Sequence, residues 1–227
     1  MNINSINMFA KILSFFYPIN ILKKSSEIHK SLELTWNNGQ LVLDTQNTNY
    51  SYGSLQRILK KGLQHIGFHK IQNFKNILVL GVAGGSVIKT LIKDINFKGK
   101  IVGVEIDPEI IAIANQYFGL DKISNLEIII NNAEHFVKNH TNKYDLIIVD
   151  IFQDKSMPEF LFENQFMDSI KLMLNKNGFV VFNTMILNNA DKKRNLNYVN
   201  SFEENEFQVI IIPKLEVFNQ LIIIKRK

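Results

Sequence analysis

Residues 76–89, NILVLGVAGGSVIK, decide the fold of this chain. An apolar run leads into the glycine-rich turn 81–86, and residues 87–93 then have the spacing of a helix. A buried strand, a tight turn and a helix in this order form the first half of a βαβ unit. Glycines let a ligand approach the backbone closely, and the free N–H groups at a helix start favour polar or anionic ligand groups. The stretch therefore predicts an α/β domain with a ligand site at its first turn.

Similar apolar runs follow the first strand and alternate with helical stretches. Runs that are apolar on both faces predict a parallel sheet covered by helices on each side. Only five residues join the last two runs, too few for a parallel crossover, so this pair should be antiparallel. The predicted fold is thus α/β, with a mostly parallel, Rossmann-like sheet of seven strands and an antiparallel C-terminal pair. The runs are ILVLG (77–81), IVGVE (101–105), LEIII (126–130), DLIIVD (145–150), FVVFN (179–183), QVIIIP (208–213) and NQLIIIK (219–225).

The N-terminal part of the chain has a different pattern. Residues 32–44, LELTWNNGQLVLD, alternate around Asn-Asn-Gly and predict a β-hairpin, and residues 50–68 have the spacing of an amphipathic helix. The run 8–22 is too short and too interrupted to span a bilayer. We expect it to pack on the body or on a partner, with membrane-surface association as the alternative. The predicted parts are an extension (1–30), a hairpin and helix region (31–70) and a catalytic domain (71–227).

Composition excludes several classes of function. The 227 residues include no cysteine, which excludes disulfides, thiolate zinc sites and cysteine catalysis and is typical of a cytoplasmic protein. A formal net charge of +5 does not favour a nucleic-acid partner. His65 and His69 have a metal-capable spacing without a third ligand, so no metal site is predicted. We expect the isolated His29, His135 and His140 to be exposed.

Polar residues at the ends of the predicted strands are the candidates for chemistry. Glu105 ends the second strand, where an acid can accept hydrogen bonds from both hydroxyls of a ribose. Asp107 precedes Pro108 and is the expected N-cap of the next helix. Asn132 follows the third strand, and an amide there can read the adenine edge or serve as an ordinary loop residue. Asp150 follows the fourth strand, where open α/β sheets place their chemistry, and Asp154 lies just beyond it.

These features together resemble the spermidine-synthase-like family of the class I S-adenosylmethionine-dependent methyltransferase fold. The resemblance covers residues 32–227. It implies that Asp150 and Asp154 are catalytic and that Tyr52 and Gln153 contact the acceptor. It also implies a set of cofactor-binding residues: Gly81, Ala83, Gly84, Gly85, Glu105, Ile106, Asn132, Ala133 and Asp150. The motifs that carry the resemblance are LGVAGGS (80–86), VEID (104–107), YDLIIVDIF (144–152), the stretch from Leu161 to Asn183, and the hairpin followed by Tyr50-Ser51-Tyr52.

Two departures from the family pattern bear on the reaction. Gly84 and Gln153 stand where aminopropyltransferases carry aspartates that bind cationic groups. We therefore expect transfer of a methyl group from S-adenosylmethionine to a small amine or hydroxyl acceptor, with Asp150 orienting the nucleophile. The alternative is an aminopropyltransferase that uses decarboxylated S-adenosylmethionine, and a third hypothesis is a non-catalytic nucleoside-binding protein. The acceptor is not identified, and a homodimer is left open.

Overall fold

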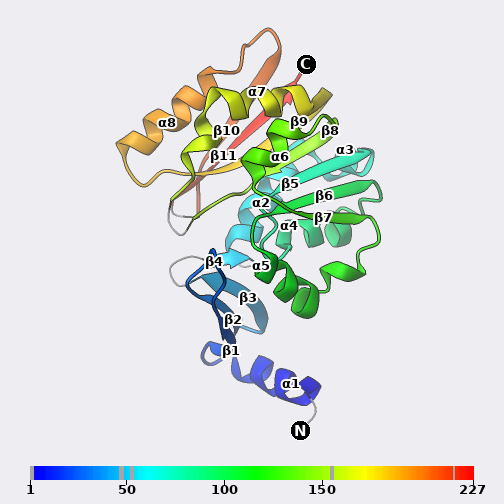
Figure 1. Ribbon diagram of the computed structural model, residues 1–227, viewed down its shortest axis with the longest axis vertical. Coiled ribbons are helices and arrows are strands. Elements are labelled where there is room, and N and C mark those ends of the chain that lie inside the picture. Colours follow the sequence, from blue (N-terminus) through cyan, green and yellow to red (C-terminus); the bar gives the residue numbers. More distant parts are fainter. Residues whose placement is uncertain (1–2, 46–48, 52–53, 154–155, 217) are drawn as a thin grey trace.

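The computed structural model describes residues 3–45, 49–51, 54–153, 156–216 and 218–227. Within these residues, the main domain is built on a seven-stranded sheet with the order β10-β11-β9-β8-β5-β6-β7 (Figure 1). This confirms the predicted α/β fold. The strands are β5 (Asn76–Leu80), β6 (Lys100–Glu105), β7 (Leu126–Ile130), β8 (Tyr144–Val149), β9 (Leu174–Met185), β10 (Phe207–Leu215) and β11 (Asn219–Arg226).

The strand directions also agree with the prediction. Strands β5 to β9 pair in parallel, whereas β11 runs antiparallel to both β9 and β10. The first strand of the sequence, β5, lies between β6 and β8. Because parallel strands end at the same edge of a sheet, the carboxyl ends of β6 and β8 flank the glycine-rich turn after β5.

Helices cover both faces of this sheet and explain the continuous apolar runs. Along β5, Ile77 and Val79 belong to one hydrophobic core, and Leu78 and Leu80 belong to the other. Period-two alternation therefore points apolar side chains to both faces. The helices are α2 (Ser54–Ile66), α3 (Phe68–Gln72), α4 (Ser86–Lys89), α5 (Pro108–Ile113), α6 (Ala133–Asn139), α7 (Asn164–Met173) and α8 (Asn189–Asn200), with π-helical turns at Thr90–Asp94 and Ala114–Phe118 and 3₁₀ turns at Leu120–Lys122 and Glu159–Phe162.

A second, smaller sheet precedes the main domain. The predicted hairpin is present as β2 (Leu32–Asn37) and β3 (Gln40–Thr45), and Asn38 and Gly39 at its turn have φ angles of 48° and 73°. Strands β1 (Ile19–Lys24) and β4 (Asn49–Ser51) extend the hairpin on its two sides. The sequence did not predict β1, because its residues continue the apolar run that begins at Met8.

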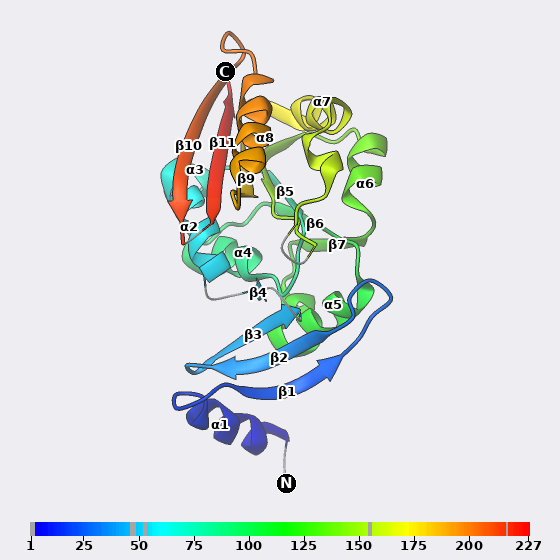
Figure 2. The same cartoon turned by 90° about the vertical axis from the view of Figure 1, so that its left-hand side faces the viewer.

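The N-terminal helix α1 (Ile3–Leu13) lies beyond β1, at the end of the molecule farthest from the large sheet (Figure 2). Over the described residues, no helix has the length and apolar character that crossing a membrane requires. The division of the chain at residues 30 and 70 stays a prediction.

Candidate active site

A cavity opens at the carboxyl ends of the central strands, between the large sheet and the N-terminal region. Most of the residues that line it lie at the ends of β5, β6, β7 and β8 or just after them. The segment before β2 and single residues of α2, β9 and β11 complete the lining. The described lining residues are Ile28, His29, Ile58, Gly81, Ala83, Val104, Glu105, Ile106, Asn131, Asn132, Ala133, Asp150, Ile151, Phe152, Gln153, Pro158, Phe160, Met185 and Asn219. The topology therefore brings most of the predicted site residues to one place.

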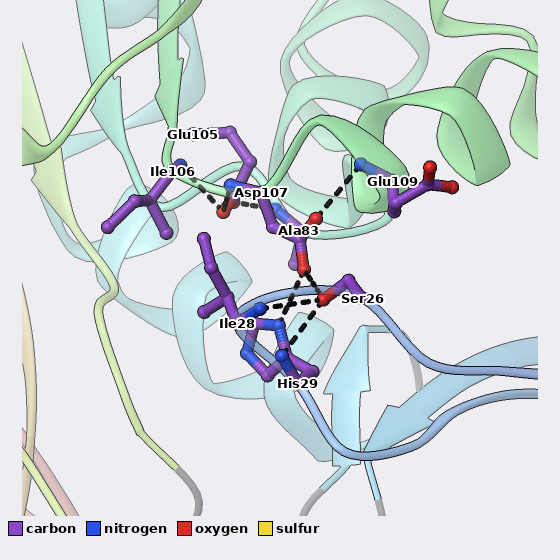
Figure 3. Close-up of polar contacts among 8 residues, drawn as sticks. All are labelled: Ser26, Ile28, His29, Ala83, Glu105, Ile106, Asp107 and Glu109. Carbon is purple, nitrogen blue, oxygen red and sulfur yellow. Dashed lines mark hydrogen bonds and ion pairs between the residues drawn. The ribbon is translucent and has the colours of Figure 1, made fainter.

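Glu105 ends β6 and is almost fully enclosed, with 5% of its surface exposed. Its Oε2 accepts the backbone N–H groups of Val82 and Ala83, each at 3.0 Å. Its Oε1 accepts those of Ile106 at 2.9 Å and Asp107 at 3.2 Å (Figure 3). Burial raises the pKa of Glu105, and the four backbone hydrogen bonds oppose that rise. The carboxylate thus ties the turn after β5 to the turn after β6.

This bonding limits how a ribose can bind Glu105. A carboxylate has about four lone-pair positions, and four backbone N–H groups already point at them. A ribose hydroxyl can therefore bind Glu105 only by sharing an oxygen with a backbone donor or by displacing one. Its assignment to the ribose stays a prediction.

Asp107 connects the same turn to the N-terminal region. Its Oδ1 accepts the N–H of Glu109 at 2.9 Å, so it caps α5 as predicted. Its Oδ2 contacts Nδ1 of His29 at 2.7 Å and accepts a hydrogen bond from the Ser26 hydroxyl (Figure 3). Burial opposes ionisation of Asp107, but the hydrogen bonds from Ser26, His29 and Glu109 together lower its pKa.

The expectation that His29 is exposed is wrong. Its residue surface is 8% exposed, and it lines the cavity beside Ile28. Local sequence does not reveal this contact, because Asp107 lies 78 residues away from His29. One feature of the sequence does point to a further contact. A carboxylate such as Asp107 can accept more hydrogen bonds than capping a helix requires.

Asp150 follows β8 on the opposite side of β5 from Glu105. Its Oδ1 accepts a hydrogen bond from Nδ2 of Asn183 in β9 at 2.9 Å. Among the described residues, its Oδ2 has no hydrogen-bond partner. Burial raises the pKa of Asp150 to about 6, and the hydrogen bond from Asn183 opposes that rise. The cavity therefore holds one carboxyl group that changes charge close to neutral pH and has an oxygen available.

The glycine-rich turn is constrained by the protein itself. Gly81 has a φ of 87°, and a Cβ atom there would lie 2.2 Å from the carbonyl oxygen of Asp150. Gly85 has a φ of 76°, and its Cβ would lie 2.5 Å from a methyl carbon of Leu120. Ala83 is strained at a φ of 48°, a conformation that residues with a side chain seldom adopt. These glycines are required for the close approach of β5 to β8 and of the turn to Leu120.

Most of the other predicted cofactor-binding residues lie at the cavity. Gly81, Ala83, Ile106, Asn132 and Ala133 line the cavity. Oδ1 of Asn132 accepts the N–H groups of Glu134 and His135 and thereby caps α6. Gly84 and Gly85 belong to the turn without being among the described lining residues. The roles of all these residues toward a ligand stay predictions.

The acceptor side of the predicted site is described only in part. Gln153 lines the cavity and forms two backbone hydrogen bonds with Ser156, which close a short loop. Tyr52 and Asp154 lie outside the described residues. Phe160, Met185 and Asn219 also line the cavity, although no sequence pattern singled them out.

A family model described as "Spermine/spermidine synthase domain" matches residues 56–224. The polyamine aminopropyltransferase of Vibrio vulnificus is 30% identical over 143 residues, which are 62% of this chain and 47% of that protein. The polyamine aminopropyltransferase of Clostridium botulinum is 28% identical over 172 residues, 74% of this chain and 56% of that protein. The chain spans about half the length of these relatives.

Solved structures show the same fold. The spermidine synthase of Thermotoga maritima aligns with a TM-score of 0.68 and 19% identity, covering 92% of this chain and 73% of that one. Human methyltransferase-like protein 13, in complex with SAH, aligns with a TM-score of 0.66 and 19% identity, covering 78% and 83%. At 19% identity the likeness shows that the chain shares the class I methyltransferase fold, and it does not show a shared activity.

The expectation that methyl transfer is the main activity is wrong. The matching family model is that of spermine and spermidine synthases, and both curated relatives above are named aminopropyltransferases. The departures at Gly84 and Gln153 therefore do not place the chain among the methyltransferases.

Proposed function

Because the chain belongs to the spermine/spermidine synthase family, we propose that it transfers the aminopropyl group of decarboxylated S-adenosylmethionine to a small amine. The family match extends over both strand ends that carry Glu105 and Asp150. The observation that carries the proposal is the Asp150 carboxyl group, held at one oxygen by Asn183 and available at the other within the cavity.

The reaction requires a neutral amine nucleophile beside a sulfonium. The amine nitrogen forms a bond to the aminopropyl carbon next to sulfur, the bond from that carbon to sulfur breaks, and methylthioadenosine leaves. The cationic amine gives up one proton to become this nucleophile, and the positive charge of the sulfonium ends on the product nitrogen. Because the sulfonium is already activated, the enzyme's main tasks are to align the reactants and to accept this proton.

Asp150 is suited to both tasks. Its ionised form attracts the cationic amine before reaction, and its open oxygen can accept an N–H of that amine. A carboxyl group with a pKa of about 6 is also a stronger base than an ordinary aspartate, which makes proton acceptance near neutral pH more favourable. Asn183 fixes the other oxygen at 2.9 Å and so limits the orientations of the carboxyl plane.

The nucleoside part of the donor is assigned to the turns after β5, β6 and β7. Ile106 and Ala133 offer apolar surface to an adenine ring, and Asn132 offers an amide beside them. Glu105 holds the first two turns in register, because its oxygens bind backbone N–H groups from both. Gly84 and Gln153 supply no charge, so Asp150 is the carboxylate with an open oxygen among the described lining residues.

The proposal is tested by supplying each donor separately and identifying the nucleoside that is released. We expect methylthioadenosine and an aminopropylated amine in equal amounts from decarboxylated S-adenosylmethionine with putrescine, cadaverine or spermidine. Intact S-adenosylmethionine should release no S-adenosylhomocysteine with the same acceptors. The absence of acceptor-dependent methylthioadenosine with all three amines, under conditions where the protein is folded, would contradict the proposal.

A further inference from the structure

The N-terminal helix α1 is attached to the small sheet through small and polar groups. The Ser14 hydroxyl, one residue beyond the helix, accepts the N–H of Gly39 at 2.9 Å, and the Ser14 carbonyl accepts that of Asn38 at 2.9 Å. Ala10 and Ser14 are buried at this contact, with 7% and 1% of their surfaces exposed. The helix is therefore fixed to the tip of the β2–β3 hairpin by the face that carries its smaller side chains.

Large apolar side chains of the same segment remain in solvent. Six of them have exposed fractions between 56% and 82%, which is unusual for neighbouring residues of a folded protein. Met8, Phe9 and Ile12 follow helical spacing within α1 and form an apolar stripe on it, and Phe15, Phe16 and Tyr17 follow just after the helix. We call the six residues the N-terminal patch: Met8, Phe9, Ile12, Phe15, Phe16 and Tyr17.

Lys11 is the only charged residue of α1 (Ile3–Leu13). Residues 1–24 contain three lysines and no aspartate or glutamate. Lys11 lies within α1 with its amine 5.7 Å from the centroid of the Trp36 ring. Lys23 and Lys24 lie at the other end of β1 and form ion pairs with Glu33 and Glu109, of which Glu109 belongs to α5. An apolar stripe with aromatic residues, a lysine on the same helix and no acidic residue in the segment is the pattern of a helix that lies in the interface of an anionic membrane.

The position of α1 favours a flat partner over a second copy of the chain. Figures 1 and 2 both show α1 at the end of the molecule, separated from the large sheet by β1 to β3. A planar bilayer surface can take up a projecting helix along its whole length. A stable protein interface needs about 800 Å² from each partner, and a single projecting helix offers a narrow contact for that purpose.

We propose that the N-terminal patch docks the protein on an anionic lipid bilayer surface, with the apolar stripe of α1 inserted at the headgroup level. The inference is independent of the proposed transferase activity. Helix α1 lies on the opposite side of the small sheet from α5 (Figure 2), and no residue of the N-terminal patch is among the described residues that line the cavity, so docking and catalysis use different residues.

The test is sedimentation of the full chain with vesicles of phosphatidylcholine alone and with added phosphatidylglycerol. Binding should rise with the anionic lipid content and fall with salt. The double variant Phe9→Ser/Phe16→Ser should bind at least about tenfold more weakly, because two apolar rings no longer enter the interface. Lys11→Glu should weaken binding to anionic vesicles specifically.

The matched control is Leu172→Ser, because Leu172 is equally exposed and belongs to α7, which lies at the other end of the molecule (Figure 1). It should bind vesicles as the wild type does, and methylthioadenosine release by all three variants should be unchanged. An absence of vesicle binding by the wild type would overturn the proposal. So would a concentration-dependent dimer, seen by light scattering, that Phe9→Ser/Phe16→Ser converts to monomer.

Discussion

Two carboxyl groups flank β5, and their surroundings differ in one decisive respect. Glu105 at the end of β6 accepts four backbone N–H groups, whereas Asp150 after β8 accepts one side-chain amide. Burial raises the pKa of both groups. At Glu105 the backbone donors stabilise the charged form and bind two turns together. At Asp150 the charge is less compensated, and an oxygen remains for a ligand.

The difference shows how one fold assigns structural and chemical roles to similar residues. A carboxylate whose oxygens all accept backbone N–H groups is held in one position, so it is suited to shaping a site. A carboxylate with one partner can exchange a proton or bind a cation at little cost to the fold. Substitutions at the two positions should therefore separate stability from turnover.

The largest effect is expected for Asp150→Asn. The amide keeps the shape and the acceptor for Asn183 but cannot take a proton or attract an ammonium. Positioned acid–base groups typically contribute about 10²–10⁴-fold, so turnover should fall by that factor. Methylthioadenosine affinity, measured by calorimetry, should stay within about threefold of wild type, a difference of less than 1 kcal/mol.

The control for Asp150→Asn is Glu159→Gln, which removes one negative charge from the exposed surface of the neighbouring 3₁₀ turn. Its turnover should remain close to that of the wild type. Equal losses in the two variants would mean that general electrostatics, and not the proton acceptor, accounts for the result. Wild-type turnover in Asp150→Asn would remove Asp150 from the mechanism.

Glu105→Gln should have its main effect on stability. The amide nitrogen cannot accept hydrogen bonds, so two backbone N–H groups of the turns lose their partner. Each buried donor left without a partner costs about 1–3 kcal/mol, so the free energy of unfolding should fall by at least about 2 kcal/mol. Urea denaturation measures this loss, and Asp150→Asn, which orphans no backbone donor, should lose less than about 1 kcal/mol. The opposite ranking would break the distinction between the two carboxyl groups.

The sequence predicted both strand-end acids because their positions follow from strand order alone. The run VEID after a buried strand and VD after another place carboxylates at the carboxyl edge of any parallel sheet. The sequence could not predict how many hydrogen-bond donors would contact each of these two carboxyl groups. That number depends on the φ angles of Gly81 and Ala83, which turn the N–H groups of Val82 and Ala83 toward Glu105.

Asp107→Asn tests the link between the nucleoside side of the cavity and the N-terminal region. Asp107 has a lowered pKa in the folded state, so its charge stabilises the fold above its ordinary value of 3.8. That contribution is lost as the pH falls through the lowered pKa. At neutral pH the variant should lose about 1–2 kcal/mol of unfolding free energy. The deficit should shrink below about pH 4, and a deficit that is constant from pH 3 to 7 would contradict an ionic contribution.

Contacts between distant segments mark the limit of prediction from the sequence. His29 and Asp107 are 78 residues apart, and Asn183 and Asp150 are 33 residues apart. In the sequence, each of these residues is either a polar residue in a predicted loop or the last residue of an apolar run, and neither pattern indicates a distant partner. Only the docking of the N-terminal segment and the parallel pairing of β8 with β9 bring the partners together.

Asn183→Ala should give the smallest effect and the sharpest test of the open carboxyl group. The amide of Asn183 donates to Asp150 and holds its pKa below the value that burial alone would give. Without this donor the pKa of Asp150 should rise from about 6 by about half a unit to one unit, equivalent to about 0.7–1.4 kcal/mol. Because the proton acceptor must be ionised, activity is lost as the pH falls through this pKa. The acid limb of the turnover profile should therefore move to higher pH by the same amount.

Asn219→Ala provides the comparison for Asn183→Ala. Nδ2 of Asn219 donates to Oδ1 of Asn183 at 3.1 Å, so the variant disturbs the same hydrogen-bond chain without removing the donor to Asp150. Its acid limb should stay within about 0.2 units of the wild type, a difference of about 0.3 kcal/mol. Equal shifts in both variants would indicate that the cavity wall has rearranged. An unshifted limb in Asn183→Ala would mean that the titration seen in turnover belongs to a group other than Asp150, because no other donor in the described structure holds its charge.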